Sequence, residues 1–210
     1  MIPTETDRSR ITQRGKDRKI RIKEVATDMF LSYGYEGTSV DEIMKQVGGS
    51  KTNLYNYFGG KEGLFNAVVQ ALCEDVLASL KILEVDNLDL RSALLSIGHR
   101  LLGMILDERH VAFQRLVIAE SGRFPTMARI WFESGPEASR KIIARCIQIH
   151  QANGSLRCSD PFLIATFFHD MIVTNPLYLA LIGSGLKQPE LERVLEEATD
   201  VILEYMTVRN

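Results

Sequence analysis

Apolar residues recur at helical spacing along almost the whole chain. Between residues 17 and 33 they mark one face of a predicted helix, at Ile22, Val25, Ala26, Met29 and Phe30. These positions lie three and four apart, as on the buried side of an amphipathic helix. We expect Gly34 to end this helix, because glycine adopts the positive φ that follows many helix C-termini.

Two short helices are predicted next, with a glycine turn between them. Thr38 or Ser39 can accept hydrogen bonds from the free backbone N–H groups at the start of the second helix. The glycine pair at 48–49 ends that helix, and Ser50 can cap a third helix that begins at Lys51. A helix, a tight glycine turn and another helix make the order of a helix-turn-helix.

The third helix has a polar face that is suited to reading DNA. With Leu54 and Phe58 on its buried side, the helical wheel turns three polar side chains outward: Thr52, Asn53 and Asn56. Such side chains reach base edges in a major groove. The rings of Tyr55 and Tyr57 flank this face, where each hydroxyl can bind a phosphate, although both rings could instead only fill a small core. Lys61 begins the following helix and forms an anion site with its free N–H groups.

Further helices are predicted in the remainder of the chain, and no convincing strand pattern occurs. Apolar positions from Leu64 to Val76 continue a helix out of the first module. Later helices are expected at 89–107, 109–121, 125–134, 136–152, 160–183 and 189–207, divided by Gly, Pro and Asn. The predicted fold is all-α, with an N-terminal three-helix helix-turn-helix DNA-binding domain followed by a helical bundle.

Charge is distributed unevenly along the 210 residues, although the net charge is only −2. Residues 1–61 hold eleven Lys and Arg against eight Asp and Glu, whereas the rest of the chain has a net charge of −5. The run 8–23 has eight basic residues and one acidic residue, Asp17. This run is either a solvated tail or an arm that binds a polyanion.

The cysteines and the most apolar stretch both indicate an intracellular, water-soluble protein. Cys73, Cys146 and Cys158 are odd in number and far apart, which favours reduced thiols in a cytoplasm. The stretch 161–183 is long enough to cross a bilayer, but it contains His169 and Asp170 near its middle. A helix inside the protein or in a subunit interface is the favoured interpretation, and no membrane partner is expected.

The segment EVATDMFLSYGYEGTSVDEIMKQVGGSKTNLYNYFGGKEGLF resembles the DNA-binding domain of TetR-family transcriptional regulators. The T-S-V cap, the S-K-x-x-L-Y-x-Y-F helix and the K-E-x-L-F start of the fourth helix carry the resemblance. It implies DNA contacts at Thr38, Ser39, Lys51, Thr52, Asn53, Tyr55, Asn56, Tyr57 and Lys61. The chain departs from the family pattern at Met44, Val47 and Gly49.

The segment RLVIAESGRFPTMARIWFESGPEASRKIIARC is similar to the C-terminal region of the AefR/AcrR-like branch of this family. It implies a helical domain for effector binding and dimerisation. Aromatic and apolar residues suggest a pocket at Phe113, Trp131, Phe132, Phe167, Phe168 and His169, although such residues are more often ordinary core. Adjacent helical residues point 100° apart, so His169 and Asp170 are not expected to face the same way.

Dimerisation is predicted on the last two helices. One stripe of the final helix is apolar, and the preceding helix offers a second candidate surface. The predicted interface comprises Phe162, Leu191, Val194, Leu195, Ala198, Val201 and Ile202.

Three domains and one function follow from these patterns. We expect a flexible basic arm at 1–15, a helix-turn-helix domain at 16–75 and a ligand-binding and dimerisation domain at 76–210. The predicted function is a homodimeric repressor that binds a palindromic double-stranded operator and responds to a small apolar or amphipathic effector. An activator of the same fold and a sequence-blind architectural DNA-binding protein are the alternatives. An enzyme is not expected, because no P-loop, H-E-x-x-H, G-x-S-x-G or cysteine-histidine ligand spacing occurs, and no metal or cofactor is expected either.

Overall fold

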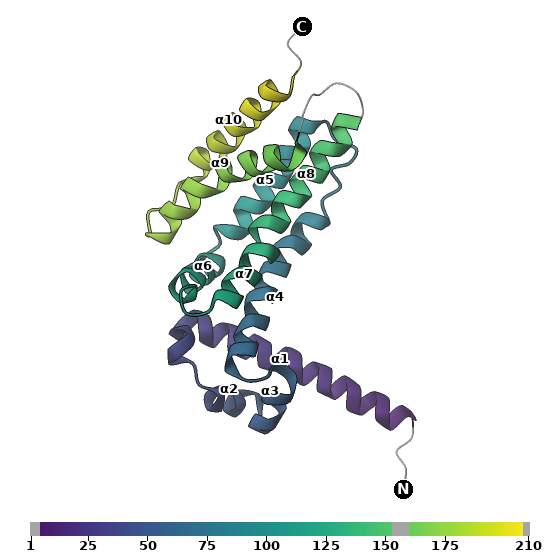
Figure 1. The fold of residues 1–210 in the computed structure, drawn as a ribbon, viewed down its shortest axis with the longest axis vertical. Helices are drawn as coiled ribbons and strands as arrows, with labels where there is room; N and C mark the ends of the chain where they lie inside the picture. The colour runs from purple at the N-terminus through teal and green to yellow at the C-terminus, as the bar shows by residue number, and fades with distance from the viewer. Residues whose placement is uncertain (1–4, 153–159, 208–210) are drawn as a thin grey trace. The chain divides into compact units, whose positions relative to one another are not determined.

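The computed structural model describes residues 5–152 and 160–207, with side chains from Gln13 onward. Figure 1 shows that these residues form helices joined by short connections. The helices are α1 (Glu5–Gly37), α2 (Val40–Val47), α3 (Lys51–Phe58), α4 (Lys61–Lys81), α5 (Leu90–Ile105), α6 (Glu108–Glu120), α7 (Pro125–Ser134), α8 (Pro136–Ala152), α9 (Pro161–Leu181) and α10 (Gln188–Met206). The all-α prediction is confirmed, and the helices predicted after residue 88 lie within two residues of these bounds.

The first helix is longer than the sequence pattern predicted. It begins at Glu5, so part of the segment expected to be a flexible arm is helical. The basic residues Arg8 and Arg10 belong to that arm, and their side chains lie outside the described residues. At the other end Gly34 kinks the helix, with φ 70° and ψ 179°, and helical backbone resumes as far as Gly37. Glycine adopts this φ without the steric penalty of other residues.

The chain folds into two compact units. The N-terminal unit comprises residues up to 71 together with 116–130, and the C-terminal unit comprises 72–115 and the residues from 131 onward. Helices α4, α6 and α7 each contribute residues to both units. The sequence pattern did not indicate that 116–130 joins the N-terminal unit.

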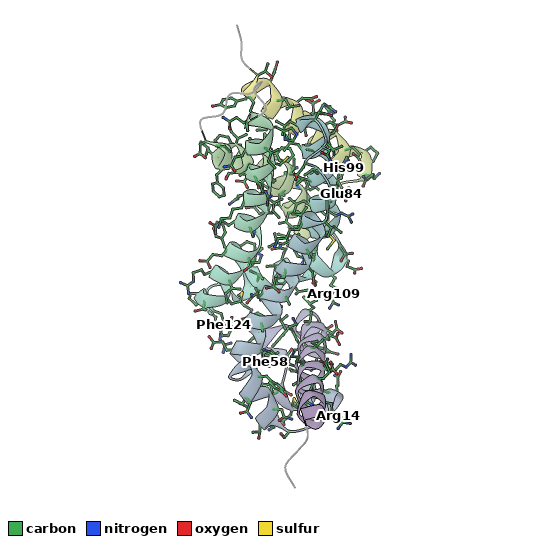
Figure 2. All side chains as sticks on the ribbon, turned by 90° about the vertical axis from the view of Figure 1, so that its right-hand side faces the viewer. Arg14, Phe58, Glu84, His99, Arg109 and Phe124 are labelled. Carbon is green, nitrogen blue, oxygen red and sulfur yellow. The ribbon has the colours of Figure 1, made fainter. Side chains whose placement is uncertain are left out.

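An aromatic cluster fills the core of the N-terminal unit. Phe30 and Phe65 are fully buried, and their ring centroids lie 5.0 Å apart. The edge of one ring faces the plane of the other. Tyr35 packs against both rings and lies 4.4 Å from the ring of Phe124, which precedes α7. Figure 2 labels Phe124 in this unit. The cluster joins α1, α4 and the α6–α7 connection, and aromatic pairs of this kind add stability beyond their buried area.

The core of the C-terminal unit lies between α5, α8, α9 and α10, with the end of α4. Leu195, Ala198 and Ile202 of α10 belong to this core and are buried. The prediction that these three residues lie in the dimer interface was therefore wrong. Helix α10 turns this face toward α5 and α9 of its own chain. The remaining predicted interface residues, Phe162, Leu191, Val194 and Val201, are exposed or half-buried.

Helices α4 and α9 are each long and apolar enough to cross a membrane by composition alone. Core helices of soluble proteins meet the same criterion, and α9 packs on α5, α8 and α10 with Phe168 and Ile172 fully buried. The thiols of Cys73 and Cys146 are free and buried, and Cys158 lies outside the described residues.

Candidate nucleic-acid interface and ligand pocket

A side-chain hydrogen bond caps the start of α2, and a glycine pair ends this helix before α3. Ser39 caps α2: its Oγ accepts from the backbone N–H of Glu42 at 3.1 Å and donates to the Glu42 carboxylate at 3.0 Å. At the other end of α2, Gly48 and Gly49 have φ of 78° and 103°, which side-chain-bearing residues rarely adopt. Ser50 stands at the N-cap of α3, but its side chain makes no capping hydrogen bond, contrary to the prediction.

Helix α3 presents the polar face that the helical wheel predicted. Leu54 is fully buried, whereas Thr52 and Asn56 are exposed and Asn53 is half-buried. Tyr55 is exposed and Tyr57 is half-buried, with its hydroxyl next to Gly15 of α1. Polar side chains that are able to hydrogen-bond to bases therefore lie on the exposed or half-exposed side of the helix.

Other predicted contact residues have different surroundings. Lys51 is exposed and forms an ion pair with Asp41 at 2.6 Å. Lys61 lies 4.3 Å from the ring centroid of Tyr35, and burial lowers the pKa of its ammonium. Thr38 is 1% exposed, and its hydroxyl donates to the carbonyl of Gly34 at 2.8 Å, so its side chain is absent from the surface.

A basic groove lies beside the polar face of α3. Its wall contains three arginines of α1, Arg14, Arg18 and Arg21, against one acidic residue, Asp17. Asn53 and Tyr57 of α3 also line it. Figure 2 shows Arg14 on the N-terminal part of α1. The three arginines belong to the basic run 8–23 but were not among the predicted contact residues. Only the fold shows that this part of α1 lies beside α3.

A separate pocket lies within the C-terminal unit. The pocket and its opening to solvent together contain about 450 Å³ of space free of protein atoms. Its described walls comprise Cys73, Val76, Leu101, Ile105, His110, Gln114, Trp131, Gly135, Pro136, Ser139, His169, Val173 and Leu177. It is a narrow, mostly apolar cavity with a few polar groups, as ligand sites usually are.

Only two of the six predicted pocket residues, Trp131 and His169, line this cavity. The other four were misplaced: Phe113 and Phe168 are fully buried in the packing, and Phe132 and Phe167 are exposed. His110 and Gln114 were missed. Their signal was a pair of polar residues four apart on the otherwise apolar buried face of α6.

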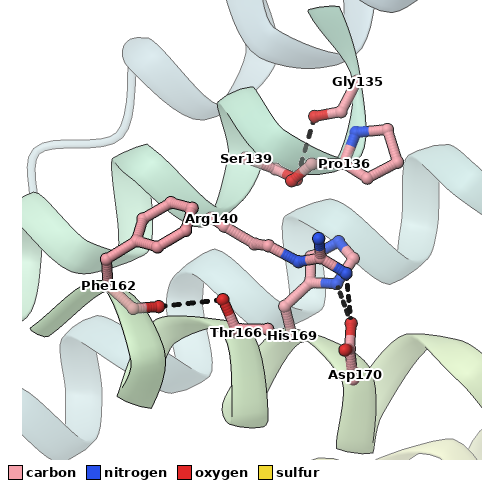
Figure 3. Close-up of polar contacts among 8 residues, drawn as sticks. All are labelled: Gly135, Pro136, Ser139, Arg140, Phe162, Thr166, His169 and Asp170. Atoms are coloured by element: carbon pink, nitrogen blue, oxygen red, sulfur yellow. Dashed lines mark hydrogen bonds and ion pairs between the residues drawn. The ribbon is translucent and has the colours of Figure 1, made fainter. Parts of the chain in front are cut away.

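His169 is held by a polar contact at the pocket wall. Figure 3 shows Asp170 Oδ1 joined to His169 Nδ1 at 2.9 Å and to the guanidinium of Arg140 at 2.7 Å. The two neighbours on α9 therefore do interact, contrary to the expectation from helix geometry. Burial lowers the pKa of His169, and the hydrogen bond to Asp170 only partly opposes this. The ring is thus neutral and donates its Nδ1–H to the carboxylate.

The buried ring of His110 should make stability depend on pH. Burial, opposed only by the charge of Asp107, lowers the pKa of His110 to about 4 from its usual 6.5. Above pH 6.5 the ring is neutral in both states, but below it the unfolded chain binds a proton that the folded chain does not. The free energy of unfolding should fall by up to about 1.4 kcal/mol per pH unit down to pH 4. Urea titrations across this range should show a smaller slope for His110→Gln, and an equal slope would contradict a neutral buried ring.

Among the described residues, no group of three His, Cys, Asp or Glu side chains is placed to hold a metal ion. The structure thus offers three candidate binding surfaces: the exposed polar face of α3, the basic groove beside it and the apolar pocket.

A capped helix, a glycine turn and a second helix with an exposed polar face beside a basic helix define a helix-turn-helix DNA-binding protein. Residues 22–68 match the family described as bacterial regulatory proteins, tetR family. Residues 92–205 match the C-terminal domain of AefR-like transcriptional repressors. The chain belongs to the TetR family of transcriptional regulators and has an AefR-like C-terminal domain. This family is non-enzymatic, as predicted.

Curated relatives share either the first module or most of the chain. Over 69 residues the chain is 39% identical to the HTH-type transcriptional regulator RutR of Escherichia coli K12. That match covers 33% of this chain and 32% of RutR, so the chain spans about a third of this relative. The HTH-type transcriptional regulator YhgD of Bacillus subtilis 168 is 27% identical over 180 residues, which is 84% of this chain and 89% of YhgD.

Solved structures share the whole fold. A TetR-family regulator from Mesorhizobium loti superposes with a TM-score of 0.81 at 28% identity, over 93% of this chain and 99% of that chain. The flavonoid-responsive regulator FrrA has the same TM-score at 30% identity, over 93% of this chain and all of FrrA.

Proposed function

We propose that this DNA-binding transcriptional regulator is a homodimeric repressor that binds a palindromic operator and is controlled by a small ligand. The observation that carries the proposal is the free polar face of α3 next to the arginines of α1. TetR-family proteins bind DNA operators, and a dimer and an effector ligand are typical of them. The DNA-binding domain is proposed to be 16–75 with the arm 1–15 before it, and 76–210 is proposed to bind the ligand and the second subunit.

Base contacts are proposed for Thr52, Asn53 and Asn56, and phosphate contacts for Tyr55, Tyr57 and Lys51. Arg14, Arg18 and Arg21 extend the phosphate surface, because their groove opens beside Asn53 and Tyr57. Lys61 and Ser39 complete the proposed set. Thr38 acts on DNA only through the turn that it stabilises, since its side chain is buried.

The roles along α3 predict two kinds of variant. Asn56→Ala should lose about 1–3 kcal/mol of binding free energy on the selected operator and little on random duplex, because a base contact is lost. Tyr55→Phe should weaken both DNAs by a similar factor, on the order of 1 kcal/mol, because only one hydroxyl is removed. Titrations of each variant against selected and scrambled operators test this. The roles are reversed if Tyr55→Phe changes base preference and Asn56→Ala does not.

Dimerisation is proposed on the apolar surface that α9 and α10 leave uncovered. Large side chains are exposed there at Phe162, Leu163, Phe167, Met171, Tyr178, Ile182, Val201 and Tyr205. Helices α9 and α10 pack on each other (Figure 1), so these residues belong to neighbouring helices. Soluble monomers rarely expose so many large apolar residues on neighbouring helices. A second copy of the same surface would cover it in a two-fold symmetric interface.

Ligand control is proposed from the apolar pocket of the C-terminal unit. The name of FrrA, which shares the whole fold, records a response to flavonoids by that protein. Helices α6 and α7 contribute to the pocket and also contain residues of the N-terminal unit, so a ligand that prefers one arrangement of these helices can change DNA affinity. Release of labelled operator on ligand addition is the measurement. A cytoplasmic location is proposed with this function, since the family consists of soluble transcription regulators.

The first experiment is selection of bound DNA from random duplex by the full chain, followed by inspection of the genes beside matching sites. A palindromic consensus, together with lower transcript levels of these genes when the protein is present, supports the repressor. A raised transcript level would favour the activator, and no enriched sequence would favour architectural DNA binding.

A further inference from the structure

Two uncharged polar side chains of α6 lie in the pocket wall without partners. His110 and Gln114 are four residues apart, which places them one turn apart on the same face of the helix. They are 9% and 6% exposed. The side-chain oxygen of Gln114, Oε1, has no hydrogen-bond partner. Within the described part of the chain, the ring of His110 makes an edge contact with Phe113 but no hydrogen bond.

A buried polar atom without a hydrogen-bond partner, such as Gln114 Oε1, is uncommon in folded proteins. Most buried polar atoms have a partner, and one that lacks a partner costs about 1–3 kcal/mol. Two other polar groups of the same wall are paired. The hydroxyl of Ser139 donates to the carbonyl of Pro136 at 2.9 Å and also lies 3.2 Å from the carbonyl of Gly135 (Figure 3). The thiol of Cys73 faces the carbonyl of Trp131 at 3.9 Å. His110 and Gln114 thus place unpaired groups on one turn of α6, where a ligand could pair with them.

The pocket wall carries no charge at neutral pH. None of its described residues is Asp, Glu, Lys or Arg. Burial lowers the pKa of both His110 and His169, so both rings are neutral, and it raises the pKa of the Cys73 thiol to about 12. An ionised ligand would enter this cavity without a counter-charge, and burying an unpaired charge is strongly unfavourable. The ligand that fits is therefore neutral.

A hydroxyl group matches the two unpaired side chains together. The oxygen of Gln114 can only accept, whereas a neutral imidazole offers one donor and one acceptor. A hydroxyl donates one hydrogen bond and accepts others, so it can serve both residues from one position. The remaining wall consists of aliphatic side chains such as Val76, Leu101 and Val173, with the indole of Trp131. The narrow cavity favours a slender body with one ring over a larger ring system.

We propose that this pocket binds a neutral apolar molecule with a hydroxyl group, which donates to Gln114 Oε1 and accepts from the ring of His110. The proposal rests on the ligand control described under Proposed function and specifies its chemistry. Gln114 is then the residue that selects a hydroxyl over an ether. The Nε2 atom of His169, whose Nδ1 donates to Asp170, is a second acceptor in the same cavity.

Three probes of one shape test the proposal by calorimetric titration of the full chain: 4-propylphenol, 4-propylanisole and 4-propylbenzoate. The phenol should bind about 3- to 10-fold more tightly than the anisole, which cannot donate to Gln114, in line with one hydrogen bond. The benzoate should not bind, because it is charged. Equal affinities for the phenol and the anisole, or binding of the benzoate, would overturn the proposal without any variant.

Two variants assign the effect to its residue. Gln114→Leu should remove the preference for the phenol over the anisole, whereas Gln148→Leu, the same change at an exposed position of α8, should keep it. A preference retained in Gln114→Leu would overturn the role of Gln114.

Operator binding is measured separately with each probe, so that the two proposals can fail independently. If the phenol binds with the expected preference but leaves operator affinity unchanged, ligand control fails and the pocket assignment holds. If none of the probes binds but the protein still binds its operator, the pocket assignment fails and the DNA-binding function holds.

Discussion

Replacing Phe167 and Tyr178 together with glutamate should convert the proposed dimer into monomers. Both side chains are at least half exposed on α9, within the apolar surface proposed as the dimer interface. In a symmetric dimer the double variant buries four carboxylates without partners, and each costs several kilocalories per mole. We expect the dimer dissociation constant to rise at least about 100-fold. Affinity for a two-half-site operator should fall by a similar factor. A subunit bound to one half-site no longer holds a second subunit near the other half-site.

Sedimentation velocity and operator titration check this result. Ile82→Glu is the matched control, because Ile82 is an exposed apolar residue of the same unit outside α9 and α10. It should leave the dimer intact. A dimer that persists in the Phe167→Glu, Tyr178→Glu variant would place the interface on another surface. Leu195→Glu would not test the interface, since Leu195 is fully buried and its replacement would disrupt the fold itself.

Gly63→Ala should destabilise the DNA-binding unit and displace α3. A β-carbon at Gly63 would overlap the backbone carbonyl oxygen of Phe58, the last residue of α3. Backbone cannot move aside as a flexible side chain can, so α3 and α4 must separate. We expect the free energy of unfolding to fall by about 1–3 kcal/mol, as for other overpacked sites. Operator affinity should fall at least about 10-fold, because the side chains proposed to read bases move with α3.

Gly103→Ala is the control for this substitution. A β-carbon at Gly103, in α5, has no atom within 4 Å, so alanine should raise helix stability there by up to about 1 kcal/mol. Urea unfolding and operator titration measure both variants. Wild-type stability and affinity in Gly63→Ala would show that α3 and α4 do not approach as closely as described.

The orientation of α3 follows from local pattern. Leu54 lies on the buried side and Asn56 on the exposed side, as the helical wheel predicted, because 3.6 residues per turn determine which side chains share a face. The helix bounds after residue 88 also follow from sequence, since Gly, Pro and Asn interrupt an otherwise continuous apolar period. The path of α1 was less predictable, because a charged segment has no apolar face to mark its helical start.

The packing partner of each apolar face is decided only by the tertiary structure. Helix α10 has apolar residues on two sides, and the sequence could not show that Leu195 faces its own core while Val201 stays exposed. For the same reason Phe168 was expected in the pocket but lies in the core. The pocket itself combines His110 of α6 with His169 of α9. The sequence by itself therefore determines helices, their faces and the DNA-reading motif, because these depend on neighbours within a few residues. The pocket and the free surface depend on contacts between residues far apart in the chain, which only folding brings together.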